Sequence, residues 1–297
     1  MSALQAASRD RGILLGYAYV VVAGVLWGLV WPMSRFCQAE GVAPLEIAFW
    51  RALIGGGCFF LHALVSRKLT VRPKHALAFC LFGFYAVGMQ FAILQIAVWE
   101  SGAALTAVLL YSAPVWVAIF SRLMFKEALS HVKVTALVFA LAGVAMICLS
   151  GGSIAGKAPS ALGIGLGLVS AVVYASIFIF FVFWKDSYST VTIYAYMLLS
   201  GAFALVPFVD ISLTKSASAW SGLLVLGVLA CYGAYFAYGQ SLRLISPVRV
   251  AILCNLEPVV GTVLCWLWWN ENFSLIGWAG SALVIGAIIF LALRQEN

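Results

Sequence analysis

Long apolar segments separated by short polar connections run through the chain from residue 15 to residue 294. Each segment holds about 20 residues, the length at which an α-helix crosses the hydrocarbon core of a bilayer. The connections carry Gly, Pro, Ser or charged residues, which favour turns. The pattern predicts ten membrane-spanning helices, at residues 15–36, 44–66, 75–98, 102–123, 131–150, 160–184, 191–211, 218–240, 247–269 and 274–294.

A pattern of rare polar and cyclic residues occurs twice along the chain. Pro114 and Pro258 are 144 residues apart, and so are Glu127 and Glu271. A shorter match precedes each copy, because Gly, Phe, Ala and Gln coincide in the segments 88–95 and 233–240 at nearly the same offset. An internal repeat of half the chain predicts two copies of one structural unit.

The predicted units are an N-terminal half, residues 1–150, and a C-terminal half, residues 151–297, with five helices each. An odd number of helices per half makes the two copies cross the membrane in opposite directions, as in the inverted repeats of secondary transporters. Thirteen of the 17 Lys and Arg residues fall on one side of this arrangement and three on the other. The positive-inside rule therefore predicts that both termini are cytoplasmic, in a multi-pass protein of the cell inner membrane.

Composition agrees with lipid as the main solvent. The chain is 64% hydrophobic and 9% charged, whereas a soluble domain has about 25% charged residues. The net charge of +7 follows from the loop bias, so we expect membrane lipid and no nucleic acid as a partner. The seven cysteines lie in or at the ends of apolar segments and suggest neither disulfides nor a metal site. No catalytic or cofactor-binding motif is present, so we expect no enzyme activity, no cofactor and no metal.

The repeated segments SAPVWVAIFSRLMFKEALS and LEPVVGTVLCWLWWNENFS, together with PLEIAFWRALIGG in the second helix, resemble the drug/metabolite transporter superfamily and its EamA-type repeat. The resemblance covers about residues 15–294 and implies a ten-helix transporter. Its members often have Gly before the Glu at the end of the repeated helix, where this chain has Lys126 and Asn270. Chain length and aromatic-rich helices are most similar to those of bacterial exporters of aromatic amino acids.

Pro114 and Pro258 lie near the middle of their predicted helices. A helix-interior proline removes one backbone hydrogen bond, which here frees the carbonyls of Leu110 and Cys254. Such carbonyls at membrane depth are tolerated in protein or beside a wet cavity, where they would ligate an ammonium group. A packing kink explains the prolines equally well.

Glu257 lies about ten residues into the ninth predicted helix, near the middle of the membrane. An ionisable residue at that depth is a functional candidate by default, either as a contact for a substrate amino group or as a proton carrier. The alternative is a structural partner for a freed backbone amide.

Deep aromatic and amide residues suggest a cavity for an amphipathic solute with a flat apolar part. Tyr232, Tyr235 and Tyr238 step by three, so they follow one helix face, and buried Tyr hydroxyls need polar partners. Aromatic packing between helices accounts for about half of such a set. We expect the first, third, fourth, sixth, eighth and ninth helices to line the cavity and the others to form an outer ring. The candidate substrate-binding residues are Trp27, Tyr85, Gln90, Tyr111, Ser112, Trp116, Tyr174, Tyr232, Tyr235, Tyr238, Asn255 and Glu257.

The sequence and the resemblance together predict a monomeric secondary transporter that exports aromatic or other apolar amino acids by alternating access. An exporter of another small metabolite or of a drug cation is the main alternative. An integral-membrane lipid enzyme is a remote alternative, because convergent His, Asp and Ser residues at one interface are missing from the predicted arrangement.

Overall fold

The computed structural model describes residues 3–150, 160–269 and 274–294, and all regular structure in them is helical. Nine helices in these ranges are long and apolar enough to cross a membrane. They match nine of the ten predicted helices. At the remaining position, residues 75–98, the chain is continuously helical from Pro73 to Ser101 but does not qualify by the same criteria. Asn270 and Glu271 lie outside the described residues.

Several predicted helices consist of two or three elements with a break or a change of helix type between them. Ser160, Ser189, Ser216 and Ser274 begin four helices by accepting a hydrogen bond from the backbone N–H three residues later, as N-cap residues do. The elements are α1 (Ala3–Gly28), α2 (Val30–Ala39), α3 (Pro44–Val65), α4 (Pro73–Gly83), π-helix η1 (Phe84–Met89), α5 (Gln90–Ser101), α6 (Ala103–Leu110), α7 (Ala113–Phe125), α8 (His131–Ser150), α9 (Ala161–Trp184), α10 (Thr190–Leu205), 3₁₀-helix η2 (Val206–Phe208), α11 (Ala217–Leu224), π-helix η3 (Val225–Gly233), α12 (Ala234–Leu244), α13 (Pro247–Cys254), α14 (Leu256–Trp269) and α15 (Leu275–Leu293).

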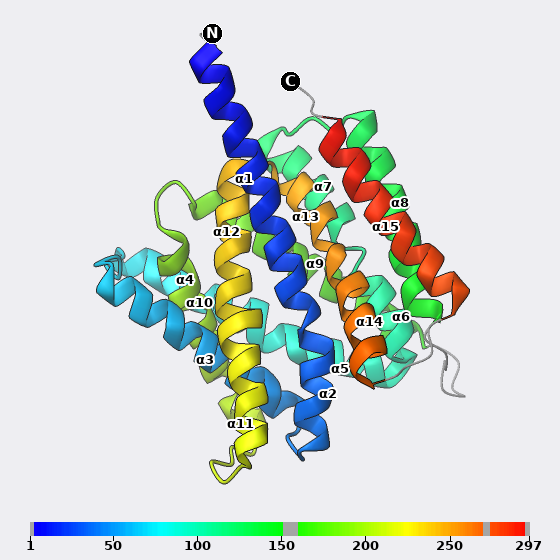
Figure 1. Ribbon diagram of the computed structural model, residues 1–297. Helices are drawn as coiled ribbons and strands as arrows, with labels where there is room; N and C mark the ends of the chain where they lie inside the picture. Colours follow the sequence, from blue (N-terminus) through cyan, green and yellow to red (C-terminus); the bar gives the residue numbers. More distant parts are fainter. Residues whose placement is uncertain (1–2, 151–159, 270–273, 295–297) are drawn as a thin grey trace.

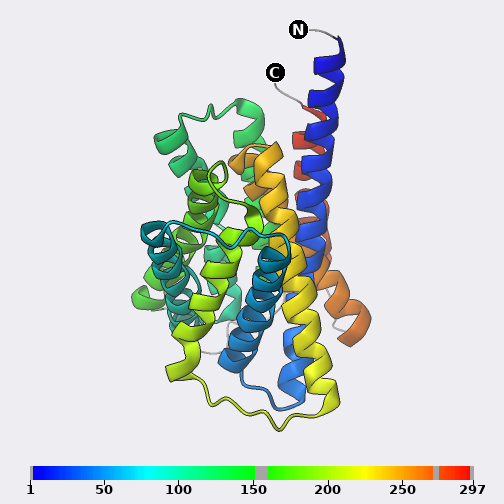
Figure 2. The same ribbon diagram turned by 90° about the vertical axis from the view of Figure 1, so that its left-hand side faces the viewer.

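Helices of the two halves pack on one another in matching pairs. α1 packs on α12, α13 and α14, whereas α9 packs on α5, α6 and α7. The pair α3 and α10 and the pair α8 and α15 flank this centre on two sides. α1 begins and α15 ends at the same end of the bundle (Figures 1 and 2). We call this end, which also holds the end of α12 and the start of α13, the terminal face, and the opposite end the distal face.

The α8–α15 pair crosses at two glycines. A Cβ atom added to Gly143 would lie 2.6 Å from the carbonyl oxygen of Gly280, and one added to Gly280 would lie 2.6 Å from the carbonyl oxygen of Gly143. Small residues allow such close backbone approach between membrane helices, where dispersion replaces the hydrophobic effect as the main source of association. The two glycines therefore fix how closely the fifth and tenth helices of the chain pack.

The turn after α7 contains the Lys126 that replaces glycine in the resemblance. Lys126 has φ +55° and ends α7 in the left-handed conformation, which glycine adopts without strain at helix C-termini. Glu127 follows, and its Oε1 lies 2.9 Å from Lys133 Nζ at the start of α8. The expected turn is thus formed in spite of the substitution, with an ion pair between the turn and α8.

Polar side chains hold the distal ends of α2, α3 and α11 together. Glu46 Oε1 lies 2.6 Å from Lys215 Nζ, and both side chains are buried. Glu40 Oε2 accepts hydrogen bonds of 2.6 Å from the hydroxyls of Ser216 and Ser218. These bonds lower the pKa of the exposed Glu40 carboxyl, because they favour its charged form.

Candidate functional site

Both proline-containing helices of the repeat are interrupted at the middle of the bundle. α6 ends and α7 begins around Tyr111 and Ser112, and α13 ends and α14 begins at Asn255. Ser112 N–H bonds the carbonyl of Leu109 at 3.1 Å, and Asn255 N–H bonds that of Ile252 at 3.2 Å, so each break is a tight i→i−3 turn. The expected kinks are therefore complete interruptions.

The prolines lie just past these breaks. Pro114 is in the first turn of α7, and Pro258 is two residues after Leu256, the first residue of α14. Proline is tolerated in a first turn because its missing N–H would have no intrahelical partner there. A similar break at Leu29, with Pro32 shortly after it, separates α1 from α2. The prolines therefore begin helices inside the membrane.

The third and eighth predicted helices each contain a π-helical segment, η1 and η3. π-helical turns are rare and frequently lie at functional sites. The two segments occupy corresponding places in the two halves, because η1 contains Gly88 and η3 ends with its matched residue Gly233. Irregular backbone thus surrounds the centre of the bundle from both halves.

One polar contact joins the two central breaks. The hydroxyl of Tyr111, in the break between α6 and α7, donates a 3.1 Å hydrogen bond to Oε1 of Glu257 in the first turn of α14. Tyr111 is 7% exposed, and Glu257 is half-buried. The contact fixes one oxygen of the carboxyl group in the centre of the bundle.

Aromatic side chains form a wall beside Glu257. The Trp27 ring lies 5.2 Å from that of Tyr235 and 5.3 Å from that of Tyr238. Tyr174 joins these rings through Phe178, whose ring lies 5.8 Å from that of Tyr174 and 5.0 Å from that of Tyr238. These rings come from α1, α9 and α12, so the wall combines both halves of the chain.

Three buried polar groups near this wall have no hydrogen-bond partner in the described part of the chain: the hydroxyls of Tyr194 and Tyr238 and the amide nitrogen of Asn255. Buried polar atoms nearly always have partners, so these groups are available to hydrogen-bond water or a solute. All three groups can donate a hydrogen bond. Tyr194 and Tyr235 have ring centroids 5.0 Å apart.

Tyr194 is the residue that the sequence reasoning missed. It belongs to α10, which was expected in the outer ring, yet its side chain is fully buried against Tyr235 and Phe181. The tyrosine within the apolar part of the seventh predicted helix was the available signal, since its hydroxyl needs a polar neighbour.

Other candidates from the sequence lie away from this centre. Tyr232 Oη lies 2.8 Å from His62 Nδ1 of α3, although Tyr235 and Tyr238 face Trp27. Gln90 donates a 3.2 Å hydrogen bond to the carbonyl of Ser170, and its Oε1 is buried without a partner in the described residues.

Ser112 Oγ donates to the carbonyl of Leu109 in its own turn, at 2.6 Å. Trp116 packs near Phe120 (6.4 Å), and Tyr85 packs near Phe82 (5.7 Å). Phe120 and Phe82 belong to a separate groove on the side of the bundle, so Trp116 and Tyr85 are placed toward that groove.

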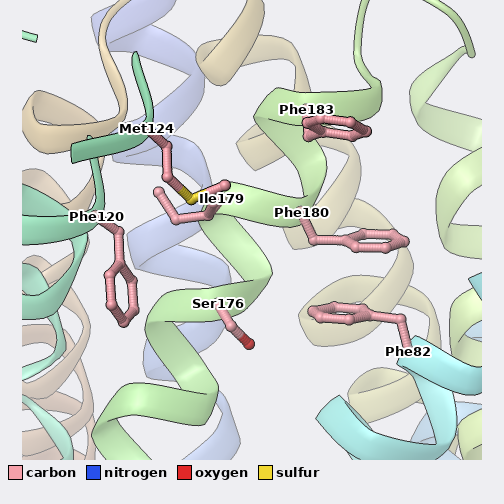
Figure 3. A pocket seen from close by; sticks show the side chains of 7 residues that line it. All are labelled: Phe82, Phe120, Met124, Ser176, Ile179, Phe180 and Phe183. Carbon is pink, nitrogen blue, oxygen red and sulfur yellow. The ribbon is translucent and has the colours of Figure 1, made fainter. Parts of the chain in front are cut away.

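This lateral groove has a volume of about 290 Å³ and lies between α4, α7 and α9 (Figure 3). Phe82 and Phe180 stack at its edge with centroids 3.8 Å apart. Ser176 and Tyr174 are two residues apart on α9, so they point to opposite sides of the helix. The groove is therefore outside the central cluster. Its lining residues are Phe82, Phe120, Met124, Ser176, Ile179, Phe180 and Phe183.

Comparison with known proteins agrees with this architecture. The sequence model of the EamA-like transporter family matches residues 14–149 and 161–293, which is once for each half. The transporter YdfC of Bacillus subtilis is 24% identical over 97% of this chain and 94% of its own length. The inner membrane transporter YicL of Salmonella typhimurium is 23% identical over 95% and 96%.

A transporter of Archaeoglobus fulgidus is 26% identical over 94% of this chain and 97% of its own. A solved structure at 17% identity superposes with a TM-score of 0.79 over 96% of this chain and 97% of that one, which shows a shared fold. None of the relatives' names states a cargo. Two family matches that together span most of the sequence show that the chain belongs to the EamA-like transporter family of the drug/metabolite transporter superfamily, as a multi-pass membrane transporter and not an enzyme.

Proposed function

We propose that this chain exports amino acids with aromatic or other bulky apolar side chains across the cytoplasmic membrane. The observation that carries the proposal is the distribution of polar groups in the central site. Glu257 accepts hydrogen bonds, and three unpartnered donors lie around the same aromatic wall, on Tyr194, Tyr238 and Asn255.

An α-amino acid in its zwitterionic form fits this distribution. Its ammonium group would bind the carboxyl of Glu257 and a face of Tyr174, where a cation gains about 0.5–2 kcal/mol from the ring. Its carboxylate would accept hydrogen bonds from the Tyr238 and Asn255 donors. Its side chain would lie against Trp27 and Tyr235. The site thereby gives each part of the solute a matching surface.

The same proposal includes ten helices in two inverted five-helix repeats, residues 1–150 and 151–297, with both termini in the cytoplasm. It is supported by the matched packing of α1 and α9, by the two central breaks and by the paired π-helical segments. Substrate would reach the site by alternating access from the two faces of the membrane. The proposed cargo is that of the bacterial exporter YddG, which the aromatic-rich sequence resembles, and the proposed unit is the monomer.

A drug cation is the second candidate, because Glu257 and the aromatic rings also suit a positive charge. A cation without a carboxylate would leave the Tyr238 and Asn255 donors without the acceptor that the zwitterion supplies, and an unpaired buried donor costs about 1–3 kcal/mol. The zwitterion is therefore the better fit.

Counterflow into proteoliposomes tests the choice. Vesicles loaded with phenylalanine should take up labelled phenylalanine in a saturable manner. Phenethylamine, which lacks the carboxylate, and 3-phenylpropionate, which lacks the ammonium, should compete at least about tenfold more weakly, as losing a paired polar group from a buried site predicts. Equal competition by phenethylamine would replace the amino-acid proposal with the cation alternative.

Glu257→Gln tests the proposed contact with the ammonium group of the solute, and Asn255→Ala tests the proposed contact with its carboxylate. Glu257→Gln should weaken competition by phenylalanine and by phenethylamine alike, because both carry the ammonium. Asn255→Ala should weaken phenylalanine and leave phenethylamine unchanged. Wild-type flux and pH dependence in Glu257→Gln would make Glu257 a structural residue.

A further inference from the structure

The central helices form two groups that meet at one end of the bundle. The first group comprises α1, α12, α13 and α14, and the second comprises α5, α6, α7 and α9. The groups contact each other where α7 meets α13 and where α9 meets α12 and α13, and α7 and α13 lie toward the terminal face (Figure 1). The bundle is therefore closed at that end.

The arrangement differs beyond the central breaks, toward the distal face. There α6 packs on α5, α8 and α9, and α14 packs on α1, α2, α8 and α15. At that end α8 contacts α6 and also contacts α14. Toward the terminal face, by contrast, α7 and α13 contact each other directly. Within the described residues, α6 and α14 do not pack on each other as α7 and α13 do.

A network of hydrogen bonds joins the groups at the closed end. Arg243, near the end of α12, donates from Nη1 to the carbonyl of Lys185 (2.5 Å), from Nη2 to the carbonyl of Tyr188 (2.6 Å) and from Nε to Thr190 Oγ1 (3.2 Å). Lys185 Nζ donates back to the carbonyl of Leu242 at 2.7 Å. Each group therefore holds the backbone of the other through a positive side chain.

The chemistry suits a reversible closure. The guanidinium fork bonds two carbonyls just past the C-terminus of α9, where the helix dipole favours positive charge. Arg243 also lies 5.7 Å from the Phe181 ring centroid. Burial lowers the pKa of the Lys185 ammonium, which is consistent with its place inside the contact. All of these bonds have water as an alternative partner once the groups separate.

We propose that Arg243 and Lys185 form a latch that closes the central site from the terminal face and that releases when the site opens to that face. The proposal rests on the proposed alternating access and identifies the contact that must break. At the offset of 145 residues that matches Gln240 with Gln95, the counterpart of Arg243 is Val98, which has no charge. An arginine latch is thus a feature of the terminal face.

The native Cys254 provides the test, because it is buried at the end of α13 beside Asn255. The other six cysteines are replaced by serine or alanine, and vesicles of both orientations are treated with a membrane-impermeant maleimide. Arg243→Gln should raise the labelling rate from the terminal face at least about tenfold, equivalent to about 1.4 kcal/mol. Arg122→Gln, an exposed cation at the end of α7, is the control and should leave that rate unchanged.

Two milder variants keep the test interpretable if Arg243→Gln fails to fold. Arg243→Lys keeps the charge and loses the fork, and Thr190→Val removes one acceptor, so both should raise labelling less than Arg243→Gln. Equal labelling in all variants and in the control would overturn the latch. Labelling needs no substrate, so a changed rate with no phenylalanine counterflow would keep the latch and reject the proposed cargo. Phenylalanine counterflow with an unchanged labelling rate would keep the proposed cargo and reject the latch.

Discussion

Replacing Gly280 by Ala should weaken the α8–α15 contact. The added Cβ would lie 2.6 Å from the carbonyl oxygen of Gly143, 2.7 Å from Met146 Cβ and 3.1 Å from the backbone nitrogen of Ile147. A carbon normally approaches a carbonyl oxygen to about 3.3–3.6 Å, so this contact is short by roughly 0.7–1 Å. Two of the three obstacles are backbone atoms of α8, which cannot rotate away, so the helices must separate.

The expected cost is about 1–3 kcal/mol, the usual range for overpacking a closely packed interface. Gly286→Ala in the same helix is the matched control, because a Cβ there meets nothing within 4 Å. Both substitutions gain the same helix propensity, up to about 1 kcal/mol. The difference between the two variants therefore isolates the clash.

The assay is the fraction of purified protein that remains monodisperse after heating in detergent. Unfolding under these conditions is irreversible, so the midpoint is an operational measure and both variants need the same heating rate. A cost of about 1–3 kcal/mol predicts a midpoint several degrees lower for Gly280→Ala than for Gly286→Ala. Indistinguishable midpoints would show that the close glycine crossing does not hold the two helices together.

Removing the Tyr111 hydroxyl with Tyr111→Phe takes a donor from Glu257, so counterflow should fall by about tenfold while the thermal midpoint stays near wild type; an unchanged rate would show that the bond does not matter for transport. Lys215→Met removes the counter-charge of the buried Glu46 carboxyl, which keeps hydrogen bonds from Trp50 Nε1 and the Ser212 N–H, so it should cost about 1.5–3 kcal/mol, and adding Glu46→Gln should restore part of the lost stability in a double-mutant cycle. The lowered pKa of Glu40 means that its contribution to stability is present above the unfolded-state pKa and is lost as the pH falls through the folded-state value. The stability difference between wild type and Glu40→Gln should therefore disappear in acid, and a difference that grew there would contradict the assignment.

The fold was largely accessible from the sequence because lipid imposes simple rules on a spanning chain. The length of the apolar segments placed nine helices that the structure contains. The central breaks were expected from Pro114 and Pro258, yet they occur just before the prolines. Proline is accommodated in the first turn of a helix more easily than in a bent interior, which the residue pattern alone does not reveal.

The candidate site was accessible only in part. Equal spacing placed Tyr232, Tyr235 and Tyr238 on one helix face, but the structure turns Tyr232 toward His62. Tyr232 lies in the π-helix η3 and the other two lie in α12, so the spacing of an α-helix does not apply between them. Apolar composition does not distinguish a π-helical turn from an α-helical one, because the difference lies in which carbonyl each N–H reaches.

The buried donors without partners have a consequence for selectivity. In the proposed amino-acid site, ordered water is the natural partner of the donors on Tyr194, Tyr238 and Asn255 before a solute binds. Binding then exchanges water for the head group of the solute, and this head group is the same for every amino acid. Discrimination is left to the side chain, at about 25 cal/mol for each Å² of apolar surface removed from water. For the proposed export of amino acids, a ranking by apolar area follows, in which a side chain with roughly 100 Å² more buried surface is preferred by about 2.5 kcal/mol, and glycine and alanine are the poorest cargo.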